Sequence, residues 1–172
     1  MDVVFTYGRF NPPHLGHKMM IEEIIDRANK LKKIPVVIVS HSTGNKTNPL
    51  SVGDKTKILK RWFPDLTVLS SSKTLPLAKI TENFNNKSVM ILGENRKDAF
   101  KFLPFNRVAL KRPNAAPSAT KARAAAIGGN KEAFKNLTGY NLTNNIQKKI
   151  LEASTVLKVR KPKTYKALIL II

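Results

Sequence analysis

The sequence predicts an α/β domain of the Rossmann-like class, a parallel sheet with helices on both faces. Short runs rich in β-branched and aromatic residues alternate along the chain with segments whose apolar residues recur at helical spacing. Residues 35–40 form an almost continuously apolar run, as in a strand buried on both faces of a parallel sheet. The 172 residues, 42% of them hydrophobic, suffice for one globular domain with a core.

The expected elements follow one another in a regular order. Strands are expected at residues 3–7, 35–40, 66–69, 88–92 and 107–110. Helices are expected at residues 15–31, 49–63, 118–127, 131–137 and 144–155, and one more around 77–84. In a parallel sheet, the loops after the first, second and fourth strands share the edge where ligands bind. We place the main domain at residues 1–140, with residues 141–172 as a C-terminal helix and tail packed on it.

The charge of the chain is strongly positive. Lys and Arg number 31 against 11 acidic residues, a formal net charge of +20. Such a field attracts polyanions, including nucleotides and nucleic acid. The lysines are spread along the whole chain, so we interpret the charge as general anion attraction and assign no nucleic-acid function. The absence of cysteine excludes thiol catalysis, disulfides and cysteine metal sites.

The ends of the chain bear on its location. Residues 1–7 are unlike a signal peptide, and no apolar run approaches the roughly 20 residues of a membrane span. The apolar residues 167–172 follow a basic stretch, 158–163. We interpret them as a terminal strand, with a surface membrane anchor as the alternative. We therefore expect a cytoplasmic protein.

Residues 8–17 carry the most specific chemical signal. Gly8 ends the first strand and permits a tight turn, and two prolines stiffen the connection that follows. His14 and His17 flank Gly16 at the start of the next helix. Bare backbone N–H groups at a helix start bind anions, and imidazoles there can donate to a phosphate whose charge grows in the transition state. Gly16 lets the backbone lie against a nucleotide.

This segment resembles the nucleotidyltransferase superfamily, whose pattern is Gly-x-Phe-x-Pro-x-His-x-Gly-His. Every fixed position of the pattern is matched, by Gly8, Phe10, Pro12, His14, Gly16 and His17. Residues 117–123 resemble the family's second motif, Ile-Ser-x-Thr-x-x-Arg, in which Ser118, Thr120 and Arg123 match and Pro117 replaces the isoleucine. Hydroxyls and N–H groups at a helix start can hold the β- and γ-phosphates, and an arginine adds charge.

A third segment narrows the resemblance. Residues 40–55 are similar to the loop after the second strand in archaeal-type nicotinamide mononucleotide adenylyltransferases, where a Ser-His pair precedes Asn-Pro-Phe-Thr-x-Gly-Glu-Arg. Arg9 also matches that subfamily, which implies a phosphate-binding role. Phage-encoded members of the superfamily have similar segments. If this protein is phage-encoded, we expect it in the cytoplasm of the host. Two features differ from the pattern of that subfamily. Residues 70–86 lack its Trp and Asp, and Asn95 replaces the Asp of the Gly-x-Asp that relatives often have after the fourth strand.

The resemblance implies in-line attack by an acceptor phosphate on the α-phosphorus of ATP, with pyrophosphate leaving. The expected catalytic residues are His14, His17 and Arg123. The expected nucleotide-binding residues are Tyr7, Gly8, Arg9, Phe10, Asn11, Gly16, Lys46, Gly93, Asn95, Pro117, Ser118 and Thr120. Mg²⁺ is the expected cofactor, held mainly by substrate phosphates rather than by a protein metal site. A transition metal on the two imidazoles is the weaker alternative. Relatives also imply a homo-oligomer.

The acceptor remains open at this point. ATP and nicotinamide mononucleotide are the first choice of substrates. Cytidylyl transfer to a phosphorylated alcohol and adenylyl transfer to phosphopantetheine keep the same fold with other substrates. A further hypothesis is a non-catalytic nucleotide or nucleic-acid binding protein that reuses the fold.

Overall fold

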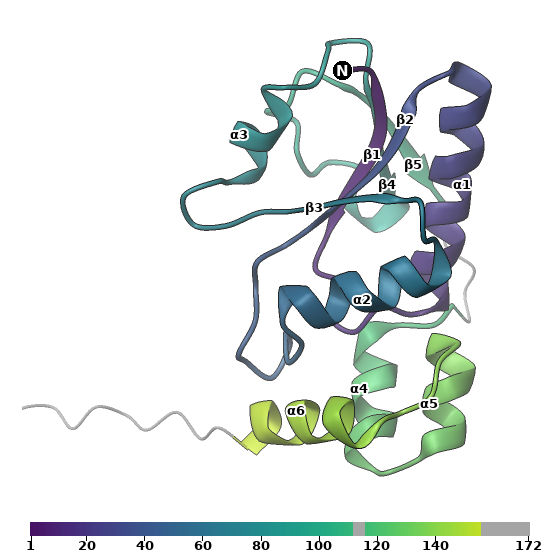
Figure 1. Ribbon diagram of the computed structural model, residues 1–172, viewed down its shortest axis with the longest axis vertical. Coiled ribbons are helices and arrows are strands. Elements are labelled where there is room, and N and C mark those ends of the chain that lie inside the picture. The colour runs from purple at the N-terminus through teal and green to yellow at the C-terminus, as the bar shows by residue number, and fades with distance from the viewer. Residues whose placement is uncertain (112–115, 156–172) are drawn as a thin grey trace, which may run out of the picture.

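The fold is built around one five-stranded parallel sheet in the order β3-β2-β1-β4-β5 (Figure 1). The computed structural model describes residues 1–111 and 116–155. The strands are β1 (Val3–Gly8), β2 (Ile34–Val39), β3 (Thr67–Ser70), β4 (Val89–Gly93) and β5 (Asn106–Leu110). The helices are α1 (Leu15–Leu31), α2 (Val52–Trp62), α3 (Leu77–Thr81), α4 (Ala119–Ile127), α5 (Lys131–Thr138) and α6 (Asn144–Thr155), with a short 3₁₀ turn at Glu94–Arg96.

Alternating side chains of the strands divide between two apolar cores. On one face, Val37, Val39 and Ile91 pack against buried residues of α1 and α2. On the other face, Phe5, Ile38 and Met90 pack against α3 and the segment between β4 and β5. Because successive side chains of a strand point to opposite faces, a strand buried on both sides must be apolar throughout. The predicted α/β fold with helices on both faces is confirmed.

The three C-terminal helices form a third core beyond the carboxyl edge of the sheet (Figure 1). Ala122, Phe134 and Ile150 are buried where α4, α5 and α6 meet. Contacts to the first motif and to α2 join this group to the rest of the fold. The Tyr140 hydroxyl donates to the carbonyl of Pro13 at 2.9 Å, and Lys149 pairs with Asp54 of α2 at 2.7 Å. The group of α4, α5 and α6 therefore packs against the first motif. The predicted tail strand or anchor lies outside the described residues.

Two predicted helix boundaries were wrong. The second helix begins at Val52 rather than at residue 49. Ser51, which the sequence already places near the cap of this helix, is its N-cap residue. Its hydroxyl accepts from the Asp54 N–H, and the Asp54 carboxylate accepts from the Ser51 N–H, so both ends of the cap are satisfied. The helix near residue 77 ends at Thr81 and is one short turn. Within the described ranges, no helix has the length and apolarity that crossing a membrane requires.

Candidate active site

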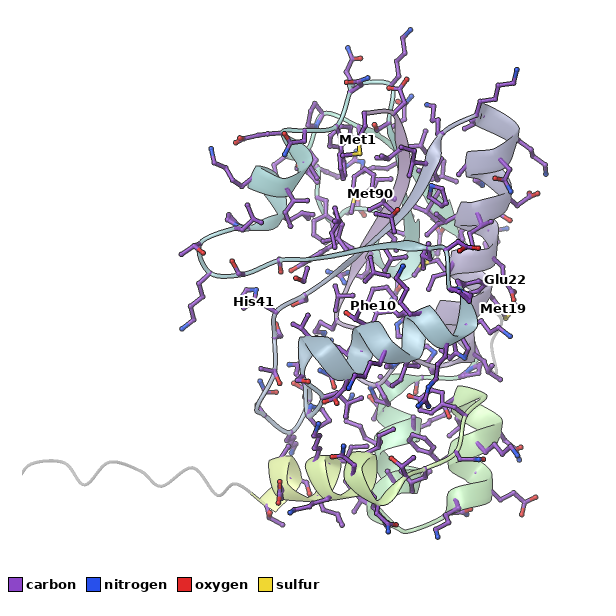
Figure 2. All side chains as sticks on the ribbon, viewed as in Figure 1. Met1, Phe10, Met19, Glu22, His41 and Met90 are labelled. Carbon is purple, nitrogen blue, oxygen red and sulfur yellow. The ribbon has the colours of Figure 1, made fainter. Side chains whose placement is uncertain are left out.

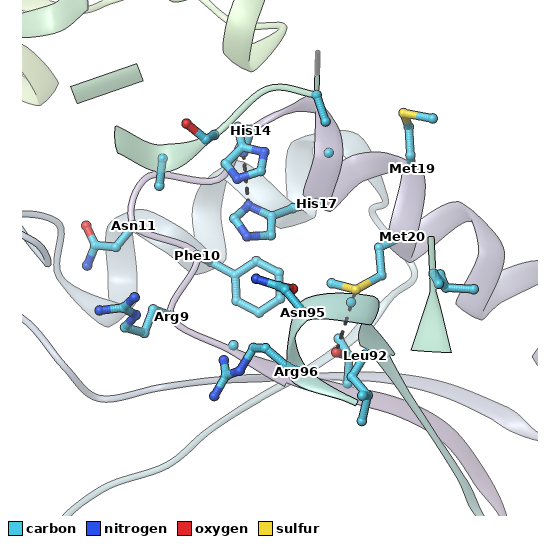
Figure 3. A pocket seen from close by; sticks show the side chains of 18 of the residues that line it. Arg9, Phe10, Asn11, His14, His17, Met19, Met20, Leu92, Asn95 and Arg96 are labelled. Carbon is cyan, nitrogen blue, oxygen red and sulfur yellow. Dashed lines mark hydrogen bonds between the residues drawn. The ribbon is translucent and has the colours of Figure 1, made fainter. Parts of the chain in front are cut away.

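A cleft of about 670 Å³ opens where the order of the strands reverses, between β1 and β4. In open α/β sheets, ligands bind at this switch point, beyond the carboxyl ends of the strands. Residues from the ends of β1, β4 and β5 and from the starts of α1 and α4 line the cleft (Figure 3). The first and second motifs therefore face one common space, although residues 18–116 separate them in the sequence.

The two histidines of the first motif are stacked at the N-terminus of α1. Their ring centroids lie 3.7 Å apart with an interplanar angle of 30°. The backbone N–H of His14, the N-cap residue, donates to Nδ1 of His17 at 3.3 Å (Figure 3). A neutral imidazole carries one proton, so a ring whose Nδ1 accepts must carry its proton on Nε2. The fold thus selects the tautomer of His17.

Phe10 supports His17 from behind. Its side chain is 1% exposed, and its ring centroid lies 4.7 Å from that of His17. Its φ of 48° is in the left-handed region, which a bulky residue adopts only when its surroundings impose it. The phenylalanine therefore works as packing beneath the imidazole and turns the chain between Gly8 and the helix.

The second motif reaches back to the first through Arg123. Its guanidinium donates to the carbonyl of Asn11 at 2.7 Å and to Oγ1 of Thr120 at 3.3 Å. The pKa of Arg123 is lowered from its ordinary value, mainly by burial and to a smaller extent by the nearby positive charge of Arg9. Two cations held together in a cleft favour a bound anion. Ser118 caps α4 by accepting from the Lys121 N–H at 3.2 Å.

Comparison with known proteins agrees with this geometry. The sequence profile of the cytidylyltransferase-like family matches residues 5–123. The chain belongs to that family. It is therefore a member of the nucleotidyltransferase superfamily, as its motifs predict. No curated protein matches the chain in sequence.

Three solved structures share the family's fold with this chain. A bifunctional NMN adenylyltransferase/ADP ribose pyrophosphatase from Francisella tularensis superposes with a TM-score of 0.64 at 16% identity, over 88% of this chain and 50% of that one. The same bifunctional protein, complexed with AMP and a manganese ion, gives 0.63 at 14%, over 87% and 52%. A macrolide-efflux protein from Streptococcus pneumoniae gives 0.57 at 18%, over 82% and 65%. The chain thus spans half to two thirds of these structures, and at such identities the likeness shows the fold alone.

Most of the residues that the sequence predicts to act in catalysis or to bind the nucleotide line the cleft. Those lining it are Tyr7, Gly8, Arg9, Phe10, Asn11, His14, Gly16, His17, Gly93, Asn95, Ser118, Thr120 and Arg123. Pro117 and Lys46 do not line it. Lys46 is exposed on the loop after β2, and its neighbour Thr47 lines the cleft instead. The carbonyl of Pro117 lies 3.4 Å from where a Cβ on Gly16 would stand. Their binding roles stay predictions.

Asn11 lines the cleft, but its side chain has a structural use. The amide donates to the carbonyl of Leu50 at 3.0 Å and accepts from the Leu50 N–H at 2.8 Å. The side chain is 2% exposed, so these bonds are shielded from water. Asn11 therefore ties the first motif to the segment that precedes α2.

Sequence reasoning missed several residues of the cleft wall. Among them are Met19, Met20, Glu23, Arg96, Phe100 and Lys111. Met20 lies four residues after Gly16 and Glu23 lies seven residues after it, so helical periodicity would have placed both on the same face of the helix as Gly16. Arg96 stacks over Phe100 at 5.1 Å, and Phe100 meets Tyr7 edge-on at 5.7 Å. No pattern in the sequence announces that aromatic contact.

The described residues contain no group of three or more His, Asp or Glu side chains that could hold a metal ion. Among the described residues lining the cleft, only Glu23 is acidic, and it lies on α1 beyond the histidines. The phosphate end of the cleft is instead cationic. That Mg²⁺ is held mainly by the substrate phosphates stays a prediction.

Proposed function

We propose that this chain transfers the adenylyl group of ATP to nicotinamide mononucleotide and releases pyrophosphate. The observation that carries the proposal is the stacked pair His14 and His17 at the start of α1, facing the start of α4 across one cleft. An acceptor phosphate oxygen bonds to the α-phosphorus while the bond from that phosphorus to the bridging oxygen breaks. Negative charge then grows on the leaving pyrophosphate.

The histidines stabilise that charge by donation. His17 carries its proton on Nε2 because its Nδ1 accepts from the backbone. A pre-positioned donor needs no reorganisation when charge develops, which is why such groups lower the barrier. His14 caps the same helix, whose N–H groups and dipole favour an anion at this point. Both groups act without forming a covalent bond to substrate.

The remaining cations and hydroxyls divide between the leaving group and the acceptor. Ser118, Thr120 and Arg123 form the start of α4 and would hold the leaving pyrophosphate. Arg9 would bind the acceptor phosphate. The contribution of the protein is then positioning and charge neutralisation, the two effects on which phosphoryl-type transfers depend.

The choice of acceptor rests on resemblance rather than on a contact. Arg9 and the loop after β2 follow the nicotinamide mononucleotide subfamily, and two of the similar structures are named as NMN adenylyltransferases. Cytidylyl transfer is the second candidate, because the family profile is cytidylyltransferase-like. We further propose that the enzyme is a cytoplasmic homo-oligomer, for which the cheapest check is the mass of the purified chain in solution.

The test is a substrate panel. The protein is incubated with Mg²⁺, each of the four ribonucleoside triphosphates, and nicotinamide mononucleotide, phosphocholine or phosphopantetheine, and pyrophosphate is measured. We expect pyrophosphate and NAD only with ATP and nicotinamide mononucleotide. Activity confined to CTP would refute the adenylyl assignment. No pyrophosphate with any pair, together with retarded migration of DNA or RNA at physiological salt, would establish the binding-protein alternative instead.

A further inference from the structure

The cleft extends along α1 beyond the histidines, to a part that the phosphate chemistry does not use. Met19, Met20 and Glu23 line this extension. Figure 3 shows Met19 and Met20 on one side of the histidine pair and Arg9 on the other. If the phosphates lie against the histidines and Arg123, as the proposed function requires, this extension lies on the nucleoside side. We infer that it holds the base of the triphosphate.

Helix geometry places Glu23 at a useful distance from the phosphate site. Gly16, Met20 and Glu23 are spaced by four and three residues, so they share one face of α1. Glu23 follows His17 by six residues, which at 1.5 Å per residue is about 9 Å along the axis. An α-phosphate beside His17 would therefore leave the ribose next to Gly16 and Met20, and the far edge of the base near Glu23.

The charge of the extension singles out Glu23. Its carboxylate is the only acidic side chain among the described residues lining the cleft, and the other charged groups there are Arg9, Arg96, Lys111 and Arg123. A carboxylate repels phosphate, so it does not serve the triphosphate tail. Arg27 pairs with Glu23 one turn along the helix and holds it in place. The side chain of Glu23 remains 36% exposed, which leaves room for a ligand contact.

A carboxylate accepts hydrogen bonds and cannot donate them. Adenine and cytosine carry an exocyclic amino group that donates, whereas guanine and uracil carry a carbonyl oxygen at the corresponding position. We propose that Glu23 contacts this one position of the base, N6 of adenine or N4 of cytosine, where guanine presents O6 although it bears an amino group elsewhere. Glu23 then selects triphosphates with an amino group at that position, and the thioethers of Met19 and Met20 pack on the ring. The residue then determines donor specificity and is distinct from the groups that act on the phosphate.

The size of the effect follows from the contact. A hydrogen bond to a charged group is stronger than one between neutral groups, and a carbonyl set against a carboxylate is repelled. We therefore expect the protein to bind ATP and CTP at least about tenfold more tightly than GTP and UTP, which is the fold-change for about 1.4 kcal/mol.

The test is equilibrium binding of the four triphosphates to the wild-type chain, Glu23→Gln and Glu22→Gln. Glutamine has nearly the same shape but both donates and accepts, so Glu23→Gln should reduce the preference to within about threefold. Glu22 is exposed and does not line the cleft, so Glu22→Gln should retain the wild-type preference. Equal wild-type binding of all four triphosphates, or an unchanged preference in Glu23→Gln, would overturn the proposal.

Pyrophosphate release from the same three proteins separates this inference from the proposed function. A binding preference that depends on Glu23, without pyrophosphate from any acceptor, would refute the transfer reaction and leave the base site standing. Pyrophosphate formed equally well from all four triphosphates would refute the base preference, while still showing that the chain transfers a nucleotidyl group. Thermal melting of each variant verifies folding, and we expect equal midpoints because Glu23 and Glu22 are both partly exposed surface residues of one helix.

Discussion

The loop before α1 and the loop before α2 both lie at the carboxyl edge of the sheet, yet they are held in opposite ways. In the first, Phe10, Asn11 and His14 are buried. The Asn11 amide bonds to Leu50 in a distant segment, and the rings of Phe10 and His14 pack on His17 of the same motif. In the second, residues 43–47 are exposed, and Asn45 Oδ1 accepts from Thr47 and Asn48 within the same loop. Figure 2 shows His41, on the second loop, well apart from Phe10.

The difference teaches which part of a reaction each loop can serve. Charge stabilisation needs donors fixed within a fraction of an ångström, which a packed loop supplies. Recognition of a variable acceptor can be carried by an exposed loop on a rigid scaffold. The packed loop is also the one that carries the superfamily motif. We therefore propose that the first loop carries the chemistry and, through Arg9, the acceptor phosphate, and that the second loop contacts the rest of the acceptor.

The largest expected effect comes from removing one imidazole of the packed loop. His17→Ala should lower kcat by about 10²-fold or more, as loss of one transition-state donor does. His41→Ala, on the exposed loop, should change kcat at saturating acceptor little and act on the acceptor KM. Steady-state kinetics of both variants measures the contrast. Near-normal turnover in His17→Ala would break the assignment.

A single methyl group should also disturb the packed loop. A Cβ on Gly16 would stand 3.1 Å from two atoms of the His14 ring, tighter than ordinary contact, so the ring must move. We expect Gly16→Ala to lower kcat by about tenfold, since displacement by about 1 Å can cost more than that. At Gly53, in α2, the nearest atom would be 3.8 Å away. Gly53→Ala should keep wild-type turnover, and equal turnover in both variants would contradict the packing argument.

The exposed loop depends on one buried cation, Lys55. This lysine is 0% exposed and donates to the carbonyls of Ser40 at 2.6 Å and Ser42 at 3.2 Å. Burial lowers the pKa of Lys55 from 10.5 to about 8. The unfolded chain thus binds more protons than the folded chain between about pH 8 and pH 10.5, and stability rises with pH in that window.

Urea unfolding at pH 7.5 and pH 9.5 tests the burial of Lys55. We expect the unfolding free energy of the wild type to rise by about 1–2 kcal/mol over this interval, and that of Lys55→Met to lack this rise. Lys57 is exposed on the same helix, so Lys57→Met should keep the wild-type gain. An equal pH dependence in the wild type and Lys55→Met would show that the lysine is not held as a buried cation.

The smallest expected effect lies at the contact between α2 and α6. Lys149 pairs with Asp54 at 2.7 Å, with side chains 34% and 19% exposed. Lys149→Met should lower the unfolding free energy by no more than about 1 kcal/mol and leave kcat unchanged. Lys148 pairs more loosely with Glu152, at 3.8 Å, and Lys148→Met should cost less still. Denaturant titration compares the unfolding free energies of the two variants. A larger loss in Lys148→Met than in Lys149→Met would show that the Lys149–Asp54 pair does not stabilise the contact between α2 and α6.

The sequence predicted the periodic parts of the molecule well. The helices at residues 15–31 and 144–155 begin and end as their apolar spacing indicates. Both family motifs line the cleft, since a parallel sheet brings the carboxyl ends of its strands to one edge. Contacts between distant segments were beyond prediction. Neither the use of the Asn11 amide by Leu50 nor the burial of Lys55 leaves a trace in local spacing, because each depends on a partner elsewhere in the chain.

Attack on the α-phosphorus of the triphosphate can be followed with ATP labelled at either the α- or the γ-phosphate, incubated with Mg²⁺ and nicotinamide mononucleotide. We expect the α-label to appear in NAD and the γ-label to leave in pyrophosphate. Transfer of the γ-label to the acceptor, or its release as inorganic phosphate while the α-label stays in a nucleoside diphosphate, would contradict attack on the α-phosphorus.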